Sequence, residues 1–478
     1  MRTAPVRPRD GIPYNAPMPG PAADNDFDLL IVGGGAAGVL TAIHALRVGA
    51  ADSRIALVEP SSTLARGVAY ATTHPEHLLN VPARRMSGFD ALPDDFVDYL
   101  GGTDSGAPRD ALAVCYAQRR QYGNYLRHRL QQARECSAST LRVIGDRVDA
   151  LEPVAGQLQA RLASGAQLSA QGAVLAVGNS ARPLPARGSG ALPAQARLEA
   201  WDFDAIKRVG PDETVCIAGS GLSMVDTALS LASNGHRGPI HVLSRHALLP
   251  LAHTAHAACD YDPEPLHALA LRQRMRHLRA AAREAMGAGA PWQAMMERTR
   301  PHVQALWRTM SQDDQRRFLR HVVRYWDVHR HRIAPQVHAH LQALQDSGQM
   351  RLHRGRLDTV ALEGGRIRIT VLMRDRRMQQ LDVDRVVNAT GVEMRAQLMR
   401  NPLLSDLLGS GHARPGPHGI GLDTGAHGEL TGIDGIPRER VLLVGSLRIG
   451  TLWESIAVPE LRTQAESAAR RLLAPAQG

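Results

Sequence analysis

Three glycines near the N-terminus, followed by one glutamate, have the spacing needed to hold a dinucleotide. In the stretch LLIVGGGAAGVLTAIHAL, a short apolar run leads into Gly33, Gly35 and Gly38 and then into helically spaced apolar residues. We expect Gly33 to form a tight turn, Gly35 to admit a pyrophosphate close to the backbone, and Gly38 to let helix and strand pack closely. A second apolar run leads to Glu59, 21 residues after Gly38, where an acid can accept hydrogen bonds from an adenosine ribose. The pattern predicts a site for FAD or NAD.

The same arrangement returns, with two changes, in the stretch TVCIAGSGLSMVDTALSLASNGHRGPIHVLSR. Met224 occupies the third glycine position, and the residue 21 positions further on is Arg245 rather than an acid. An acid would repel a 2′-phosphate, whereas an arginine can bind one through charge-assisted hydrogen bonds, so we expect NADPH here. The alternative, Arg245 as a solvated strand-end residue of an NADH site, stays open. The residues assigned to this second site are Gly219, Ser220, Gly221, Ser223 and Arg245.

Two dinucleotide sites in one chain suggest that a nicotinamide reduces a flavin. Two further strand-to-glycine exits bracket the second site. One ends at Gly178, and the other leads through Thr390 to Gly391. We interpret them as the two crossings between a flavin domain and an inserted nicotinamide domain, and we expect Thr390 and Gly391 to contact cofactor.

The region from 255 to 350 is rich in alanine, arginine and histidine with helical spacing. In its densest part, Arg330 and Arg332 belong to a basic cluster that could meet a substrate carboxylate or the NADPH phosphates, and we assign them to substrate. Four histidines, at 329, 331, 338 and 340, suggest a metal site, but no acidic or cysteine partner recurs at ligand spacing. We therefore expect no metal.

Composition excludes several classes of protein. The four cysteines form no C-x-x-C pair, and no uninterrupted apolar run is long enough to span a membrane. The net charge of +10 favours anionic partners, but only 4% of the residues are aromatic and no nucleic-acid-binding motif is present. The proline-rich residues 1–26 read as a disordered tail. We expect a cytoplasmic protein that binds neither nucleic acid nor membrane; a homo-oligomer is compatible with the sequence.

Two longer stretches carry a resemblance to a known family. The segment ARGVAYATTHPEHLLNVPARRMSGFDALPDDFVDYL and the C-terminal VLLVGSLRIGTLWESIAVPELRTQA are similar to segments of FAD/NAD(P)-binding proteins with two dinucleotide-binding domains, related to class B flavin monooxygenases and amino-acid N-hydroxylases. Members are similar to enzymes that hydroxylate amino-acid amines, including an aspartate N-monooxygenase (nitrosuccinate synthase) type. The resemblance is specific for the cofactors and weak for the substrate.

Within these stretches, further residues are expected at the flavin. Asn80 and Val81 lie in a loop that could pass the isoalloxazine, where Asn80 could serve catalysis; an ordinary turn asparagine is the alternative. Trp453 and Glu454 are expected to open the last helix, either as an anchor and a cap or as a flavin-side pair. The remaining expected FAD contacts are Gly67, Met86 and Gly445.

We predict an α/β protein with two Rossmann-like dinucleotide-binding domains, the second inserted in the first. The expected parts are a flavin domain at 27–205 and 378–478 and an NADPH domain at 206–377, with the helical insertion at 255–350. The resemblance implies a monooxygenase that uses FAD, NADPH and O₂ to hydroxylate a small, anionic, aspartate-like amine through a C4a-hydroperoxyflavin. Two alternatives stay open: an NADPH-dependent electron transferase that reduces a protein or quinone, and a non-enzymatic flavin redox sensor.

Overall fold

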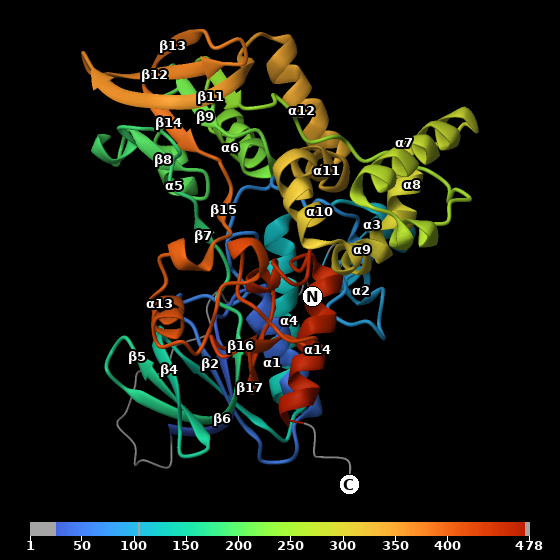
Figure 1. Cartoon of the computed structure of the whole chain (residues 1–478), viewed down its shortest axis with the longest axis vertical. Coiled ribbons are helices and arrows are strands. Elements are labelled where there is room, and N and C mark those ends of the chain that lie inside the picture. The colour runs from blue at the N-terminus through green and yellow to red at the C-terminus, as the bar shows by residue number, and fades with distance from the viewer. Residues whose placement is uncertain (1–24, 104–105, 474–478) are drawn as a thin grey trace, which may run out of the picture.

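The computed structural model describes residues 25–103 and 106–473. The expected disordered tail therefore lies, up to residue 24, outside the described residues. Within the described ranges, no helix has both the length and the apolar character needed to cross a membrane. Two sheets lie at opposite ends of the molecule's long axis, with a group of helices beside their junction (Figure 1).

The first sheet is built around β1 (Asp26–Val32), which pairs in parallel with β2 (Arg54–Val58) and β6 (Gln167–Leu175). All three strands are rich in buried apolar residues, as expected of parallel strands covered on both faces. The other strands of this sheet are β3 (Thr140–Ile144), β4 (Val148–Val154), β5 (Gln157–Leu162), β16 (Glu429–Thr431) and β17 (Pro437–Leu443).

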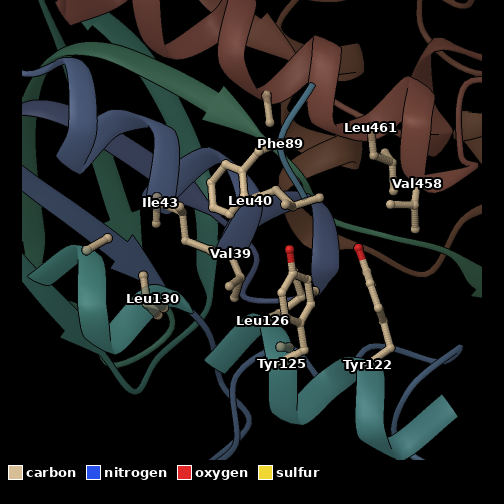
Figure 2. Packing of buried hydrophobic residues seen from close by; sticks show 14 of the residues in the cluster. Val39, Leu40, Ile43, Phe89, Tyr122, Tyr125, Leu126, Leu130, Val458 and Leu461 are labelled. Atoms are coloured by element: carbon tan, nitrogen blue, oxygen red, sulfur yellow. The ribbon is translucent and has the colours of Figure 1, made fainter. Parts of the chain in front are cut away.

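Three helices build the largest core against this sheet. Helix α1 (Ala36–Val48) lies between α4 (Arg119–Cys136) and α14 (Val458–Leu473) and presents Val39, Leu40 and Ile43 to them. Figure 2 shows Tyr122, Tyr125, Leu126 and Leu130 of α4 reaching toward these residues from one side, and Val458 and Leu461 of α14 from another. Because α1 is held on several sides, its N-terminus is a rigid platform. The smaller helices of this part are η2 (Ala83–Arg85), α2 (Asp95–Thr103), α3 (Arg109–Val114), η7 (Ala396–Leu398), α13 (Pro402–Gly409), η8 (Pro417–Gly419) and η9 (Ser446–Arg448).

The second sheet has β9 (Val215–Ala218) near its centre, in parallel with β10 (Ile240–Ser244) and β14 (Arg385–Asn388). Its remaining strands are β8 (Arg197–Glu199), β11 (Met350–Glu363), β12 (Arg366–Met373) and β13 (Met378–Val383). The helices of this part are η3 (Ser189–Ala191), α5 (Phe203–Lys207), α6 (Leu222–Ser233) and α12 (Pro335–Asp346). The prediction of an α/β protein with two Rossmann-like parts is confirmed.

A short antiparallel ribbon marks where the chain passes between the two sheets. It consists of β7 (Ser180–Ala181) and β15 (Val392–Glu393), which follow the two predicted exits at Gly178 and Gly391. The expected domain boundaries at 205 and 378 do not coincide with the division between the sheets. Strand β8 on one side, and β13 and β14 on the other, belong to the second sheet.

The helical insertion follows β10 and lies to the right of the junction in Figure 1. Its helices are η4 (Glu264–Ala268), α7 (Leu271–Gly287), α8 (Trp292–Thr299), η5 (Arg300–His302), α9 (Val303–Thr309), α10 (Gln312–Arg317), the π-helical turn η6 (Phe318–Val322) and α11 (Val323–Arg330). The expected end at 350 is too late. Helix α12 packs on α6 with Val337 and Leu341 in the core of the second sheet, so it is the crossover from β10 to β11.

Candidate active site

The first glycine loop has the geometry expected of a dinucleotide cradle. Gly33 follows β1 with φ of +104°, and a Cβ there would lie 2.4 Å from the carbonyl oxygen of Ala176. A Cβ on Gly38 would lie 1.8 Å from the carbonyl oxygen of Gly33, so any side chain would force α1 away from the turn. The turn and the close packing predicted from these two glycines are therefore both present.

Gly35, in contrast, faces open space. It is the N-cap of α1, and a Cβ there would meet only Gly67 Cα, at 3.8 Å. The loop after β2 places Gly67 opposite, and Ala65 in that loop donates from its backbone N–H to the carbonyl oxygen of Gly34 at 2.8 Å. Because neither residue has a side chain, the two backbones approach closely beside a helix N-terminus, where unpaired N–H groups favour an anion.

Glu59 lies beside this loop, as its spacing predicted. Its carboxylate accepts hydrogen bonds from the backbone N–H groups of Gly34 at 2.6 Å and of Ser61 at 2.9 Å. Gly445 also borders the loop, because a Cβ on it would lie 3.6 Å from the Cβ of Ala37 in α1. Residues far apart in the chain therefore converge on one cradle.

The other expected flavin contacts occupy different places. Met86 is buried in the core beneath α1, and Val81 packs partly buried against the same core. Thr390 and Gly391 lie next to the second glycine loop, since a Cβ on Gly219 would contact the Thr390 nitrogen at 3.2 Å. Their contacts with cofactor stay predictions.

Asn80 lies where the part of the molecule built on the first sheet meets the part built on the second sheet. Its carbonyl oxygen accepts a hydrogen bond from His253 Nε2 at 2.7 Å, and the residue borders a small gap together with Leu222 and Ile333. Burial, with Arg332 adding to it, lowers the pKa of His253 to about 4, so its imidazole is neutral at pH 7. The catalytic role of Asn80 stays a prediction.

Trp453 and Glu454 do not open the last helix, which begins at Val458. The Trp453 ring stacks on Trp307 of the insertion, with ring centroids 4.9 Å apart. Glu454 has φ of +59°, a conformation that non-glycine residues rarely adopt, and its buried carboxylate accepts hydrogen bonds from Trp326 Nε1 and Arg330 Nε, both at 2.8 Å. The expected helix start is wrong, because this strained turn intervenes.

The second glycine loop repeats the turn of the first. Gly219 has φ of +113°, and a Cβ there would lie 2.1 Å from the carbonyl oxygen of Ala389. Gly221 caps α6 and faces open space, with only Arg324 Nη2 near the position of a Cβ, at 3.9 Å. Ser220 is buried and donates to Ser244 Oγ at 2.8 Å or to the Leu248 carbonyl at 2.7 Å, whereas Ser223 accepts from Trp201 Nε1 at 3.3 Å.

Three arginines gather beside this loop. Arg245 follows β10, Arg354 lies on β11 in register with Ser244, and Arg324 comes from α11 of the insertion. Burial, together with the positive charges of these three arginines, lowers the pKa of the His246 imidazole between them. Sequence reasoning found Arg245 but missed Arg354, which lies over a hundred residues away and is brought close only by strand pairing.

A second group of arginines, buried except for the half-buried Arg85, lies where the insertion meets η2, the turn at Glu454 and α14. Arg330 forms an ion pair with Glu454, and Arg332 shares Glu297 of α8 with Arg85 of η2. Burial alone would raise the pKa of Glu297, but the guanidinium groups of Arg85 and Arg332 outweigh it and lower that pKa to about 2. A fourth arginine, Arg300, lies 3.9 Å from Glu460. We call Arg85, Arg300, Arg330 and Arg332 the buried arginine cluster.

Several donors of this cluster have no partner among the described residues. They are Nη2 of Arg330 and both Nε and Nη1 of Arg332, although the two residues are only 8% and 2% exposed. Burial lowers the pKa of both Arg300 and Arg332, and neighbouring arginines add to that effect. Unsatisfied buried guanidinium groups are costly, so this arrangement is suited to receiving an anion. The sequence identified Arg330 and Arg332 but neither Arg85 nor Arg300.

The two halves are joined by a buried polar contact next to Asn80. Arg119 of α4 pairs with Asp226 of α6 at 2.5 Å, and His77 Nε2 lies 3.0 Å from both the Asp226 carbonyl and Ser230 Oγ. His77 is fully buried. This contact keeps the loop that carries Asn80 against the middle of α6.

Comparison with known proteins supports the same architecture. Residues 30–180 match the model of a protein family described as FAD-NAD(P)-binding, so this part of the chain is an FAD-NAD(P)-binding domain. No curated protein sequence matches the chain. Solved structures do match it over nearly their whole lengths.

Two of these are amine hydroxylases. The ornithine N-hydroxylase of Kutzneria sp. 744, solved with reduced FAD, NADP⁺ and L-ornithine, is 15% identical, with a TM-score of 0.64 over 94% of this chain and 99% of that one. The L-lysine 6-monooxygenase of Pseudomonas syringae is 17% identical. Its TM-score is also 0.64, over 93% of this chain and 99% of that one. A bacillithiol disulfide reductase from Staphylococcus aureus is 14% identical and has a lower TM-score of 0.54 over 95% and 100%. At these identities the likeness shows a shared fold.

Proposed function

We propose that this protein is an FAD-dependent monooxygenase that is reduced by NADPH and hydroxylates the nitrogen of a small amine carrying a carboxylate, with aspartate-like amino acids as the first candidates. The proposal rests on a match to an FAD-NAD(P)-binding family, two glycine loops and a buried arginine cluster. The stronger likeness to amine hydroxylases than to a disulfide reductase supports it.

The first glycine loop fits FAD. A side chain at Gly35 would project toward Gly67, whose Cα its Cβ would already contact at 3.8 Å, at the N-terminus of a helix that is packed on several sides. Gly33, Gly35 and Gly67 would hold the pyrophosphate, and Glu59 the ribose. When bound, the flavin supplies the chemistry of accepting a hydride and activating oxygen, and the protein supplies position and a dry surrounding.

The second loop fits NADPH. Gly219 and Gly221 would hold its pyrophosphate at the start of α6, while Arg245 and Arg354 would bind the 2′-phosphate. Arg324 lies next to Gly221 and adds positive charge on the pyrophosphate side. Arg324 is already paired with Asp327 at 3.1 Å, but NADH would leave the guanidinium groups of Arg245 and Arg354 without a phosphate to bind, which makes the NADH alternative less favourable.

The buried arginine cluster fits the carboxylate of the substrate. Its four arginines face three carboxylates, those of Glu297, Glu454 and Glu460, which leaves an excess of one positive charge. One substrate carboxylate would neutralise that excess and accept hydrogen bonds from the unpartnered nitrogens of Arg330 and Arg332. Arg85 is part of the short helix that directly follows the loop of Asn80, so a carboxylate held here would keep the attached amine near that loop.

The single observation that carries the proposal is this set of unpartnered, buried guanidinium nitrogens. The test is a screen of amines that carry a carboxylate, each compared with the same amine after removal of the carboxylate. The readouts are the rate of NADPH oxidation and the formation of a hydroxylamine product. We expect coupling with a carboxylate-bearing amine and none with its decarboxylated partner.

Substitution of Arg332 sharpens the screen. The variant Arg332→Lys keeps the charge but loses the planar fork, so we expect a KM for the amine raised about tenfold or more, with reduction of the flavin by NADPH unchanged. The exposed Arg237, which pairs with Asp212 on the surface, provides the control Arg237→Lys, for which we expect no change. An unchanged KM for the amine in Arg332→Lys would show that the buried arginine cluster does not bind the substrate.

The electron-transferase alternative has one observation in its favour, the likeness to a bacillithiol disulfide reductase. All four cysteines lie within the described residues, and no two of them form a disulfide. If no amine couples to NADPH oxidation while a quinone or protein acceptor is rapidly reduced, this alternative replaces the hydroxylase.

A further inference from the structure

Three potential metal ligands come together in the insertion, away from both glycine loops. Glu264 and His267 lie on η4, and His302 ends η5. Their ligand atoms all lie within 4.8 Å of one another. His267 Nε2 is 3.3 Å from His302 Nδ1, which is in turn 3.5 Å from Glu264 Oε1. Sequence reasoning missed this group because it weighed only the histidines at 329, 331, 338 and 340.

The two separations that involve His302, 3.3 Å and 3.5 Å, match a tetrahedral zinc site. Bonds of about 2.0–2.1 Å at tetrahedral angles place two ligand atoms about 3.4 Å apart. Glu264 and His267 are three residues apart on a 3₁₀-helix, whose geometry aligns side chains at that spacing on one side. The third ligand then comes from a separate helix.

We propose that Glu264, His267 and His302 bind a zinc ion. Two imidazoles and one carboxylate suit Zn²⁺, whereas Ca²⁺ and Mg²⁺ prefer oxygen ligands alone. Glu264 is 69% exposed and the two histidines are partly buried, so the fourth position opens to solvent and is available to water. The site is independent of the proposed function, because none of its residues belongs to a glycine loop or to the buried arginine cluster.

The position of the site indicates its role. Leu266, between the two ligands on η4, and Val303 and Leu306, which follow His302, line an apolar cavity of about 50 Å³ that also contacts Trp453. The buried guanidinium of Arg274 already donates to the carbonyl oxygens of His267 and Leu306. A zinc ion would therefore join η4 to η5 across the rim of this cavity and stabilise the insertion.

The test is isothermal titration of the chelator-treated full-length protein with zinc chloride, with the thermal unfolding midpoint as the second readout. We expect saturable binding of one ion per chain by these ligands and a midpoint that rises with zinc. Loss of an outer-shell partner alone weakens metal sites about tenfold or more, so His267→Ala and His302→Ala should each weaken binding by at least that much and abolish the shift.

Two further variants keep the test decisive. Glu264→Gln changes an exposed side chain, so it can be examined even if a histidine variant fails to fold, and it should also weaken binding. His340→Ala removes an exposed histidine on α12 and should bind zinc as the unaltered protein does. Absence of saturable binding, or equal affinity in Glu264→Gln and the unaltered protein, would overturn the proposal.

Discussion

The two glycine loops share a turn but differ in what surrounds it. In the first, the helix touches the turn at Gly38, where no side chain fits; in the second, the fully buried Met224 occupies the equivalent position. The first loop is enclosed by a loop of its own domain through Gly67 and by Gly445. The second is bordered by arginines, one of them from the insertion. The first loop is therefore enclosed mainly by backbone, whereas the second is surrounded by positive charge.

The acid and the arginine that follow the two loops also differ in their surroundings. Glu59 lies against its loop, bonded to two backbone N–H groups, whereas Arg245 is exposed next to Arg354. In the proposed assignment, the anion at one position would bind the ribose hydroxyls of FAD, and the cations at the other would bind the 2′-phosphate of NADPH. The same turn can therefore serve two nucleotides because the residues around it differ.

The largest expected effect comes from filling either loop. We expect Gly35→Val to leave the fold intact, since a Cβ there makes only an ordinary contact with Gly67 Cα at 3.8 Å, but its side chain would occupy the space proposed for the pyrophosphate. We expect a folded protein that has lost its FAD, measured by flavin absorbance after gel filtration. The matched change Gly221→Val should keep the flavin and lose reduction by NADPH. If Gly35→Val retains FAD, the first assignment is wrong.

The next effect concerns the choice between nucleotides. Arg245→Ala removes a charge-assisted contact of about 1.5–3 kcal/mol, so NADPH should bind about tenfold to hundredfold more weakly. Arg354→Ala should act in the same direction. NADH lacks the 2′-phosphate and should be little affected by either change. Dissociation constants for both nucleotides provide the measurement, and equal losses for the two would exclude the phosphate role.

The smallest expected effect is a pH dependence of protein stability that arises from His253, where the parts built on the two sheets meet. The pKa of His253 is lowered to about 4 from its ordinary 6.5, so the unfolded chain binds more protons between these values. The stability contributed by neutral His253 is fully present above pH 6.5 and is lost as pH falls toward 4. Urea denaturation from pH 7 to 4.5 should show a shallower decline in His253→Gln than in the unaltered protein. Parallel declines would contradict this account of His253.

Sequence reasoning found both loops because their requirements are local. Gly33 and Gly219 have positive φ, which favours glycine. A Cβ on Gly38 would clash with the carbonyl oxygen of Gly33, so this position also requires glycine. The acid and the arginine follow at a fixed distance because the strand and helix between them have regular lengths. These features could be predicted without a structure.

The buried arginine cluster could be predicted only in part. Arg330 and Arg332 stood out in a basic helical stretch, but Arg85 comes from η2 and meets Glu297 across more than two hundred residues. The turn at Glu454 has no local signal, because a glutamate with positive φ is held there by Trp326 and Arg330. Similarly, α12 looks like the rest of the insertion until its packing on α6 is seen.

In the proposed reaction, oxygen is transferred to an amine whose carboxylate is held by the buried arginine cluster. The most direct measurement is the reaction of the FAD-loaded protein with NADPH, a coupling amine and ¹⁸O₂, followed by mass spectrometry of the product. We predict a hydroxylamine that carries one ¹⁸O atom. NADPH consumption with no labelled product from any carboxylate-bearing amine, and with electrons passing instead to a quinone or protein, would contradict the claim.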